Sequence, residues 1–277
     1  MKPRIAITLG ASFLGYATHA GFLARLHELG VRPVHVAGSS AGAIAAGLYA
    51  VGLPQQRIRE EVLRSHLRRS FIRRTKWLLH QLPFPWVRRP SMFDPAGAIT
   101  HLESIVGDTR IEDLRAPKLT IAHAHLDTQT THFAQHGPLA RAMAASCCLP
   151  VMFDPIEFEG ARCHDGGIAH ELPMDMWFDD SEVDIIIAHR IIHPESQPSR
   201  FFPGNVLHWT GKAHETAATQ LMHYREKLAV MHGKKLHLAD TVHGRPPMLL
   251  DWNLQSYYDL GTTTAQRCYD EYLRPLI

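Results

Sequence analysis

The sequence predicts an α/β fold with a mainly parallel central sheet. In its first part, a short apolar strand, a glycine-bearing loop, a helix, a second short strand, a glycine turn and a buried helix follow one another. Strands that alternate with helices in this order are typical of a parallel sheet. The composition agrees, because 45% hydrophobic and 20% charged residues over 277 positions are a globular balance. That balance excludes a disordered chain, a collagen and a coiled coil.

Each element of this first part has its own signal. Arg4–Leu9 is apolar and rich in β-branched residues, which indicates a buried strand. Apolar residues at helical spacing follow as far as Leu29, and Gly30 closes that helix. Val34–Ala37 is expected as the second strand and Ala41–Val51, rich in Ala, Ile and Leu, as a buried helix. Together they predict two parallel strands with helices packed on the sheet.

The remainder of the chain carries further periodic segments and no repeat, low-complexity tract or linker. One domain over residues 1–277 is therefore expected. The basic stretch Arg57–Lys76 has helical spacing and is expected as one helix. The other predicted elements are strands at Lys118–Leu126, Thr131–Gln135, Val183–His189 and Leu236–Ala239, and helices at Ala96–Val106, Leu139–Ala145, Val206–Met231 and Gln255–Leu273.

Cysteine usage and hydropathy suggest a compartment. The four cysteines form no C-x-x-C pair, so neither a zinc ribbon nor a disulfide scaffold is indicated, and a reducing compartment is the simpler interpretation. No apolar run is long enough to span a bilayer. We therefore expect a cytoplasmic protein, with peripheral contact to a membrane left open.

A G-x-S-x-G motif, Gly38-Ser39-Ser40-Ala41-Gly42, lies between the second predicted strand and the buried helix. This strand-to-helix context is the one that a nucleophile elbow requires. The small residues allow a sharp turn, and the helix N-terminus favours negative charge near the serine oxygen. Ser40 is therefore the candidate nucleophile. The alternative is a plain turn with an N-capping serine.

The serine needs a base, and the sequence offers two kinds. With 20 histidines in the chain, a Ser-His-Asp triad stays open. The motif Asp165-Gly166-Gly167 presents a carboxylate where the chain can bend and where another element can approach closely. A carboxylate acts as a base if its surroundings raise its pKa. In isolation, however, D-G-G is more often a turn.

The loop after the first strand is the candidate oxyanion hole. It runs from Gly10 to Gly15, between the first strand and the first helix, where backbone N–H groups can point at a developing negative charge. We expect the amides of Gly10, Ala11 and Ser12 to be the donors. The alternative is a simple strand–helix connection.

The glycine loop, the early G-x-S-x-G and the late D-G-G stand in the order of the patatin-like phospholipase family, which the chain resembles over most of its length. Gly38–Ile44 is similar to the family's G-T-S-A-G-A-I, and Ala142–Pro150 resembles its A-x-x-A-S-x-A-x-P segment. Pro173 follows the D-G-G motif, as a proline does in relatives.

This resemblance implies a three-layer, patatin-like α/β fold and hydrolysis of acyl esters in lipids, of the phospholipase or lysophospholipase type. It implies a catalytic dyad with Ser40 as nucleophile and Asp165 as base, a covalent acyl-enzyme, and neither a catalytic histidine nor a metal or other cofactor. The glycine loop departs from the family's G-G-G-x-[RK]-G, because Ala11 and Ser12 replace glycines and Leu14 replaces the basic residue. A positive φ at Ala11 or Ser12 would cost about 1 kcal/mol or more.

The departures leave alternatives open. One is a non-hydrolytic module that keeps the fold and binds a membrane or a partner. Another is an acyltransferase or thioesterase that uses the same serine. Acyl chain, headgroup, oligomeric state and regulation stay undetermined at this stage.

The segment of about 55–90 is strongly basic. Between Arg57 and Arg89 it holds ten Lys or Arg and two Asp or Glu. A basic amphipathic helix suits the surface of an anionic membrane, so this segment is a candidate lid or docking element. The opposing interpretation is a solvated helix face. Nucleic acid is not expected, because no aromatic stacking platform accompanies the charge. The residues predicted for the membrane or lid are Arg64, Arg68, Arg69, Arg73, Arg74 and Trp77.

A pair of histidines, His123 and His125, lies on one predicted strand and would face the same side. Such a pair could bind a metal. No carboxylate or cysteine stands at a convincing ligand spacing, so a histidine-rich strand without a metal is the expected outcome.

Overall fold

A mixed β-sheet runs through the centre of the protein. The computed structural model describes residues 3–72, 74–75, 91–194, 206–245 and 253–277. The strand order is β10-β9-β1-β2-β5-β8-β7, and β6 also pairs with β5. The strands of this sheet are β1 (Ile5–Leu9), β2 (His35–Ser39), β5 (Lys118–His125), β6 (Thr130–Ala134), β7 (Ile156–Phe158), β8 (Ala161–Asp165), β9 (Ile185–Ile192) and β10 (Lys235–Val242).

One part of the sheet is parallel and one edge is antiparallel. β10, β9, β1, β2 and β5 pair in parallel, whereas β6 and β8 pair antiparallel with β5, and β7 pairs antiparallel with β8. The parallel part confirms the predicted fold class. The β7–β8 hairpin was not predicted. Its turn places Glu159 (φ 49°) and Gly160 (φ 79°) at positive φ, and glutamate is an unusual residue in such a turn.

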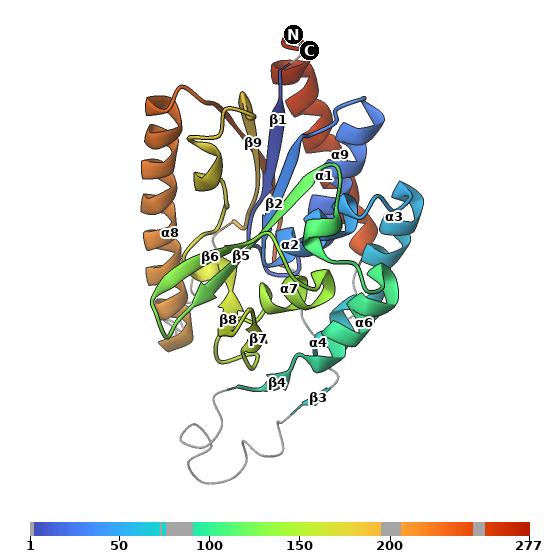
Figure 1. The fold of residues 1–277 in the computed structure, drawn as a ribbon, viewed down its shortest axis with the longest axis vertical. Helices are drawn as coiled ribbons and strands as arrows, with labels where there is room; N and C mark the ends of the chain where they lie inside the picture. The colour runs from blue at the N-terminus through green and yellow to red at the C-terminus, as the bar shows by residue number, and fades with distance from the viewer. Residues whose placement is uncertain (1–2, 73, 76–90, 195–205, 246–252) are drawn as a thin grey trace.

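Helices cover both faces of the sheet, which makes three layers. α1, α2 and α9 lie on one face, and α8 lies on the other (Figure 1). The strands alternate accordingly: Ile5 and Ile7 of β1 belong to the core shared with α1, α2 and α9, whereas Ala6 packs in the core that contains Met222 and Ala229 of α8. The helices are α1 (Tyr16–Glu28), α2 (Ala41–Ala50), α3 (Gln55–Leu63), α4 (Ser65–Ile72), α6 (Ala96–Val106), α7 (Leu139–Ala145), α8 (Val206–Met231) and α9 (Leu254–Cys268).

The remaining elements are short. A two-stranded antiparallel ribbon joins β3 (Arg74–Thr75) to β4 (Phe93–Asp94). A π-helical turn, Tyr269–Leu273, continues α9. Short turns lie at Ile111–Asp113, Gly166–Ile168 and Asp175–Trp177.

The basic segment differs from the prediction of one helix over Arg57–Lys76. Arg64 is extended (φ −78°, ψ 139°) and separates α3 from α4, so the periodic pattern continues across a break in the backbone. The structure also buries Arg68 to 4% exposure in α4, next to Leu67. Arg68 therefore does not contribute to an exposed basic face of α4 in this structure.

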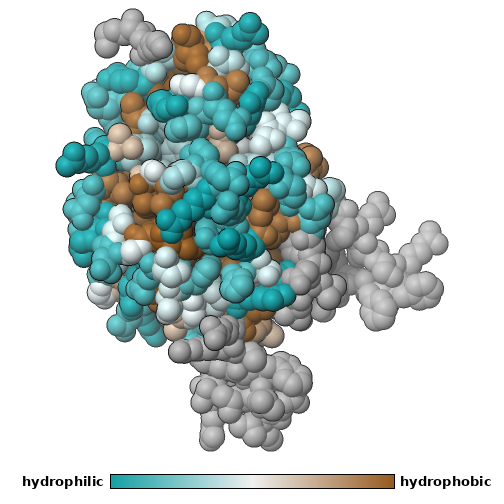
Figure 2. Space-filling model, turned by 90° about the vertical axis from the view of Figure 1, so that its right-hand side faces the viewer, coloured by the Kyte–Doolittle hydropathy of each residue, from teal (hydrophilic) through white to brown (hydrophobic). Residues whose placement is uncertain are grey.

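No helix among the described residues is both long and apolar enough to cross a membrane. The side that carries α3 and α6 in Figure 1 is mainly hydrophilic, and its hydrophobic areas are interrupted by polar side chains (Figure 2).

Candidate active site

Ser40 sits in a strained turn between β2 and α2. Its backbone has φ 53° and ψ −121°, a conformation that few residues other than glycine adopt. This conformation costs on the order of 1–3 kcal/mol, and it persists only where the surrounding contacts impose it. The turn makes Ser40 the N-cap of α2 and leaves its side chain half-buried at the carboxyl edge of the parallel strands. This is the geometry of a nucleophile elbow.

Two glycines allow this turn to close. A Cβ atom added to Gly38 would lie 2.3 Å from the backbone oxygen of Gly42, and one added to Gly42 would lie 2.2 Å from the backbone oxygen of Leu9. Any side chain at either position would push α2 away from the strands. Glycine is therefore required at both positions, because a side chain would not fit there.

Asp165 is hydrogen-bonded to the serine. Ser40 Oγ donates to Asp165 Oδ2 at 2.6 Å, and the Gly167 amide donates to Asp165 Oδ1 at 2.8 Å. Asp165 is the last residue of β8 and is 6% exposed. One oxygen of the carboxylate is thus fixed by the backbone, and the other faces the serine.

The glycines after Asp165 bring this carboxylate into place. A Cβ atom on Gly166 would lie 2.2 Å from the Ala122 oxygen in β5, and one on Gly167 would lie 2.4 Å from Cβ of Ala11. The D-G-G turn is therefore packed between β5 and the loop that follows β1. As the sequence predicted, the two glycines allow close approach by other elements.

The loop after β1 differs from the predicted oxyanion hole at two of three amides. The Gly10 amide donates to the His189 oxygen at 3.0 Å, which continues the β1–β9 pairing by one residue. The Ala11 amide donates to the Glu171 oxygen at 2.9 Å. The Ser12 amide makes no hydrogen bond within the described part of the chain. The positive φ in this loop falls on Leu14 (56°), not on Ala11 or Ser12.

The start of α2 offers a second free amide. Ala41 is the first residue of α2, and the first N–H groups of a helix have no acceptor inside it. In nucleophile elbows, the residue after the nucleophile supplies one oxyanion donor. The amides of Ser12 and Ala41 are therefore candidate oxyanion donors that have no acceptor among the described residues.

The comparison with protein families agrees with this geometry. Residues 9–177 match the family model of patatin-like phospholipases. This chain belongs to the patatin-like phospholipase family. The matched region contains both Ser40 and Asp165.

Relatives of this patatin-like chain are known from sequence and structure. Uncharacterized NTE family proteins of Mycobacterium bovis and Mycobacterium tuberculosis are 33% identical over 206 residues, which are 74% of this chain and 54% of theirs. The chain therefore spans about half the length of the curated relatives it matches. The crystal structure of VipD from Legionella pneumophila aligns with 98% of this chain and 67% of its own, with a TM-score of 0.55 and 12% identity. The two proteins share the fold.

The sequence did not single out Ser146, which the structure places beside the patatin-like elbow. Ser146 follows α7, is 0% exposed, and its Oγ accepts the amide of Ser40 at 2.9 Å. The available signal was its place in the Ala142–Pro150 segment, where it stands at the serine of the A-x-x-A-S-x-A-x-P pattern.

The cysteines beside the site are neutral. Burial, followed by the charge of Asp165, raises the pKa values of the Cys147 and Cys148 thiols well above their ordinary value. The thiolate is the nucleophilic form of cysteine, so neither residue competes with Ser40 at neutral pH.

The histidines take other roles. Among the hydrogen bonds of the described residues, that of Ser40 Oγ goes to Asp165 and not to an imidazole. His123 Nε2 bonds to the Ala142 oxygen at 2.9 Å, and His125 Nε2 lies 3.2 Å from Cys163 Sγ. Within the described ranges, no three His, Cys, Asp or Glu residues are placed to hold a metal ion.

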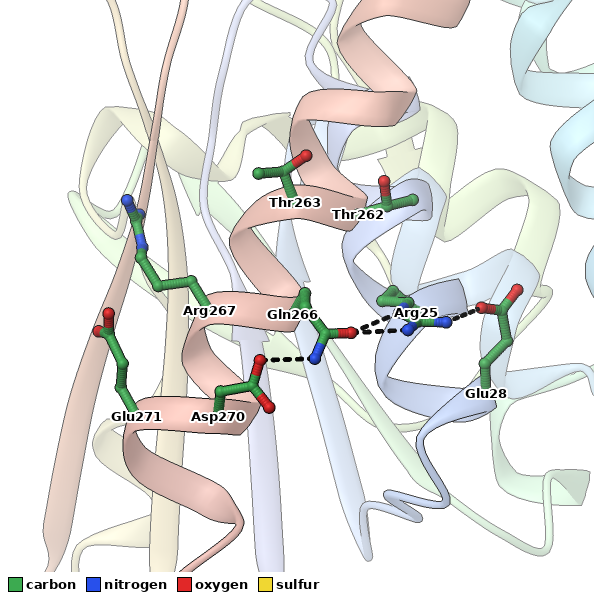
Figure 3. Close-up of a pocket in the computed structure, with 8 residues that line it drawn as sticks. All are labelled: Arg25, Glu28, Thr262, Thr263, Gln266, Arg267, Asp270 and Glu271. Atoms are coloured by element: carbon green, nitrogen blue, oxygen red, sulfur yellow. Dashed lines mark hydrogen bonds and ion pairs between the residues drawn. The ribbon is translucent and has the colours of Figure 1, made fainter.

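A groove of about 690 Å³ between α1 and α9 has a different character (Figure 3). Arg25 bonds to Gln266 across it at 2.9 Å and to Glu28 of its own helix at 2.8 Å. None of the lining residues is a serine, cysteine or histidine. The lining residues are Arg25, Glu28, Thr262, Thr263, Gln266, Arg267, Asp270 and Glu271.

The other predicted membrane residues are only partly described. Arg64 and Arg69 are exposed, and Arg64 lies 3.2 Å from Glu61. Arg74 belongs to β3, whereas Arg73 and Trp77 lie outside the described residues.

Proposed function

We propose that this patatin-like chain hydrolyses acyl esters of lipids through Ser40 and Asp165. The observation that carries the proposal is the 2.6 Å hydrogen bond from Ser40 Oγ to Asp165 Oδ2. A serine becomes nucleophilic when an adjacent base takes its proton. Asp165 is the base in hydrogen-bond reach, and its other oxygen is held by Gly167.

The reaction has two steps. Ser40 Oγ attacks the ester carbonyl, Asp165 accepts the Oγ proton, and the amides of Ser12 and Ala41 stabilise the oxyanion. The alcohol leaves with the proton from Asp165, and Ser40 stays acylated. Asp165 then takes a proton from the water that attacks the acyl carbonyl. It returns this proton to Ser40 Oγ as the bond between Oγ and the acyl carbon breaks, which releases the carboxylic acid and the free serine. Loss of a single oxyanion donor typically costs about 100- to 1000-fold in kcat.

The membrane part of the proposal rests on charge. The exposed Arg64 and Arg69 give the α3–α4 region cationic groups, and each such group near an anionic headgroup contributes about 1 kcal/mol. Lipid substrates reside in such surfaces, so these helices are the proposed docking element.

The decisive experiment is labelling with a fluorophosphonate probe, followed by peptide mass spectrometry and assay on a panel of lipid esters. We expect the label on Ser40, no label in Ser40→Ala, and slow labelling in Asp165→Asn. Ser104→Ala is the control, because Ser104 lies in α6, outside α3–α4, and its Oγ donates to the His101 oxygen of the same helix at 2.6 Å. Full turnover by Ser40→Ala would refute the dyad. A folded wild-type chain with neither label nor turnover would favour the non-hydrolytic binding module.

A further inference from the structure

We infer that Ser146 is a positioning residue that holds both members of the dyad in register. The inference rests on the proposed function, because it concerns the alignment of Ser40 with Asp165. It adds to that function a residue that neither attacks the substrate nor moves a proton.

The Ser146 hydroxyl links the elbow to the sheet. Its Oγ donates to the Ala122 oxygen of β5 at 2.7 Å and accepts the Ser40 amide at 2.9 Å. A hydroxyl has one proton, which here goes to a carbonyl, so its lone pairs are free to accept the Ser40 N–H. The directions of both bonds are therefore determined.

These two bonds act on the strained residue. Ser40 adopts φ 53° and ψ −121°, and such a conformation persists only where several contacts impose it. Ser146 fixes the Ser40 amide relative to β5, and Asp165 pairs with that same strand, through His123. The nucleophile and the base are thus both held in position relative to β5.

The backbone of the same segment holds the base. The Gly166 amide donates to the Ser146 oxygen at 3.2 Å, and the Asp165 amide donates to the Cys148 oxygen at 3.0 Å. The last carbonyl groups of a helix accept no hydrogen bond from within that helix, so those at the end of α7 can accept hydrogen bonds from other segments. Residues 146–148 therefore contact Ser40 on one side and Asp165-Gly166 on the other.

Loss of the hydroxyl would remove two hydrogen bonds beside the nucleophile. In Ser146→Ala, the Ser40 N–H and the Ala122 C=O would each lose a bond to a side chain that is itself 0% exposed. The Ser40 turn would then relax away from Asp165. Because small misplacements of reacting groups cost up to about 100-fold in rate, we expect a loss in kcat rather than in substrate binding.

The test compares Ser146→Ala, Ser146→Thr and the control Ser104→Ala on the full chain, with rates corrected for the folded fraction from urea titration. We expect Ser146→Ala to lower kcat and the fluorophosphonate labelling rate about 10- to 100-fold, with KM nearly unchanged. Ser146→Thr keeps the hydroxyl and is expected to recover most of the labelling rate.

Two results would overturn the inference. One is labelling of folded Ser146→Ala at the rate of Ser104→Ala. The other is a folded Ser146→Thr that labels no faster than Ser146→Ala. Failure of this inference can be distinguished from failure of the proposed function. If the proposed function were wrong, turnover would persist in Ser40→Ala, whatever the rates of the Ser146 variants.

Discussion

Lowering the pH from 7 to 5 is expected to destabilise this protein strongly through its buried histidines. Burial lowers the pKa of His19 to about 3 and that of His123 to about 4, from an ordinary value of 6.5. His123 shows why: Nε2 bonds to the Ala142 oxygen, and Nδ1 is buried with no partner in the described residues, so an added proton there would find no acceptor.

The sign and size of the effect follow from linkage. The folded pKa is depressed, so the unfolded chain binds protons first as pH falls below about 6.5, and stability is full only above that value. Between pH 7 and pH 5, one histidine that titrates only when unfolded costs about 2 kcal/mol, so His19 and His123 together cost about 4 kcal/mol. The total free energy of unfolding of a domain is about 5–15 kcal/mol.

The assay is urea unfolding followed by tryptophan fluorescence at pH 7, 6 and 5. His123→Gln keeps an N–H donor for the Ala142 oxygen but cannot titrate. Below the ordinary histidine pKa, its free energy of unfolding should therefore fall with pH less steeply than that of the wild type, and the two slopes should differ by about 1.4 kcal/mol per pH unit. The exposed His223→Gln is the matched control and should follow the wild-type slope. Equal slopes for His123→Gln and wild type would refute this reasoning.

Three further predictions follow from the site and its surroundings. Gly42→Ala should abolish ester hydrolysis and lower the free energy of unfolding by a few kcal/mol, because the new Cβ would lie 2.2 Å from a carbonyl oxygen of β1. Gly244→Ala is the control and should match the wild type in the same assays, because a Cβ there has nothing within 4 Å. Arg225→Met should cost about 1–3 kcal/mol in urea unfolding, since Arg225 joins α8 to the loop after the base at 3.1 and 3.3 Å; an unchanged midpoint would argue against this link. Arg64→Glu combined with Arg69→Glu should weaken sedimentation with anionic vesicles but not with zwitterionic ones, and equal binding to both would remove α3–α4 as the docking element.

Ser40 and Asp165 lie in short glycine motifs that are visible in the sequence, whereas their pairing as a dyad was expected from the resemblance to the patatin-like family. Gly38 and Gly42 flank the serine where any side chain would clash, and two glycines follow Asp165 for the same reason. Such steric demands leave a short motif that can be seen without knowledge of the fold. The first parallel strands and their helices were predictable for a similar reason, because their apolar periodicity is continuous.

The features that sequence reasoning missed depend on contacts between distant segments. Ser146 stands in a recognised segment, but its contact with Ser40 exists only in the fold. The amides of Gly10 and Ala11 are lost as donors because β9 and the loop after the base accept them. The α3–α4 break was hidden because the periodic pattern runs across extended Arg64.

The separation of the two dyad residues along the chain has a consequence for biosynthesis. Ser40 and Asp165 are 125 positions apart, and β1 pairs with β9, which begins only at Ile185. A growing chain therefore exposes its serine on a ribosome well before the aspartate exists. On the proposed mechanism, that serine is an ordinary alcohol until β8 docks on β5. Hydrolysis can begin only once most of the sheet has been made and assembled, so the unfinished chain is harmless to nearby lipids.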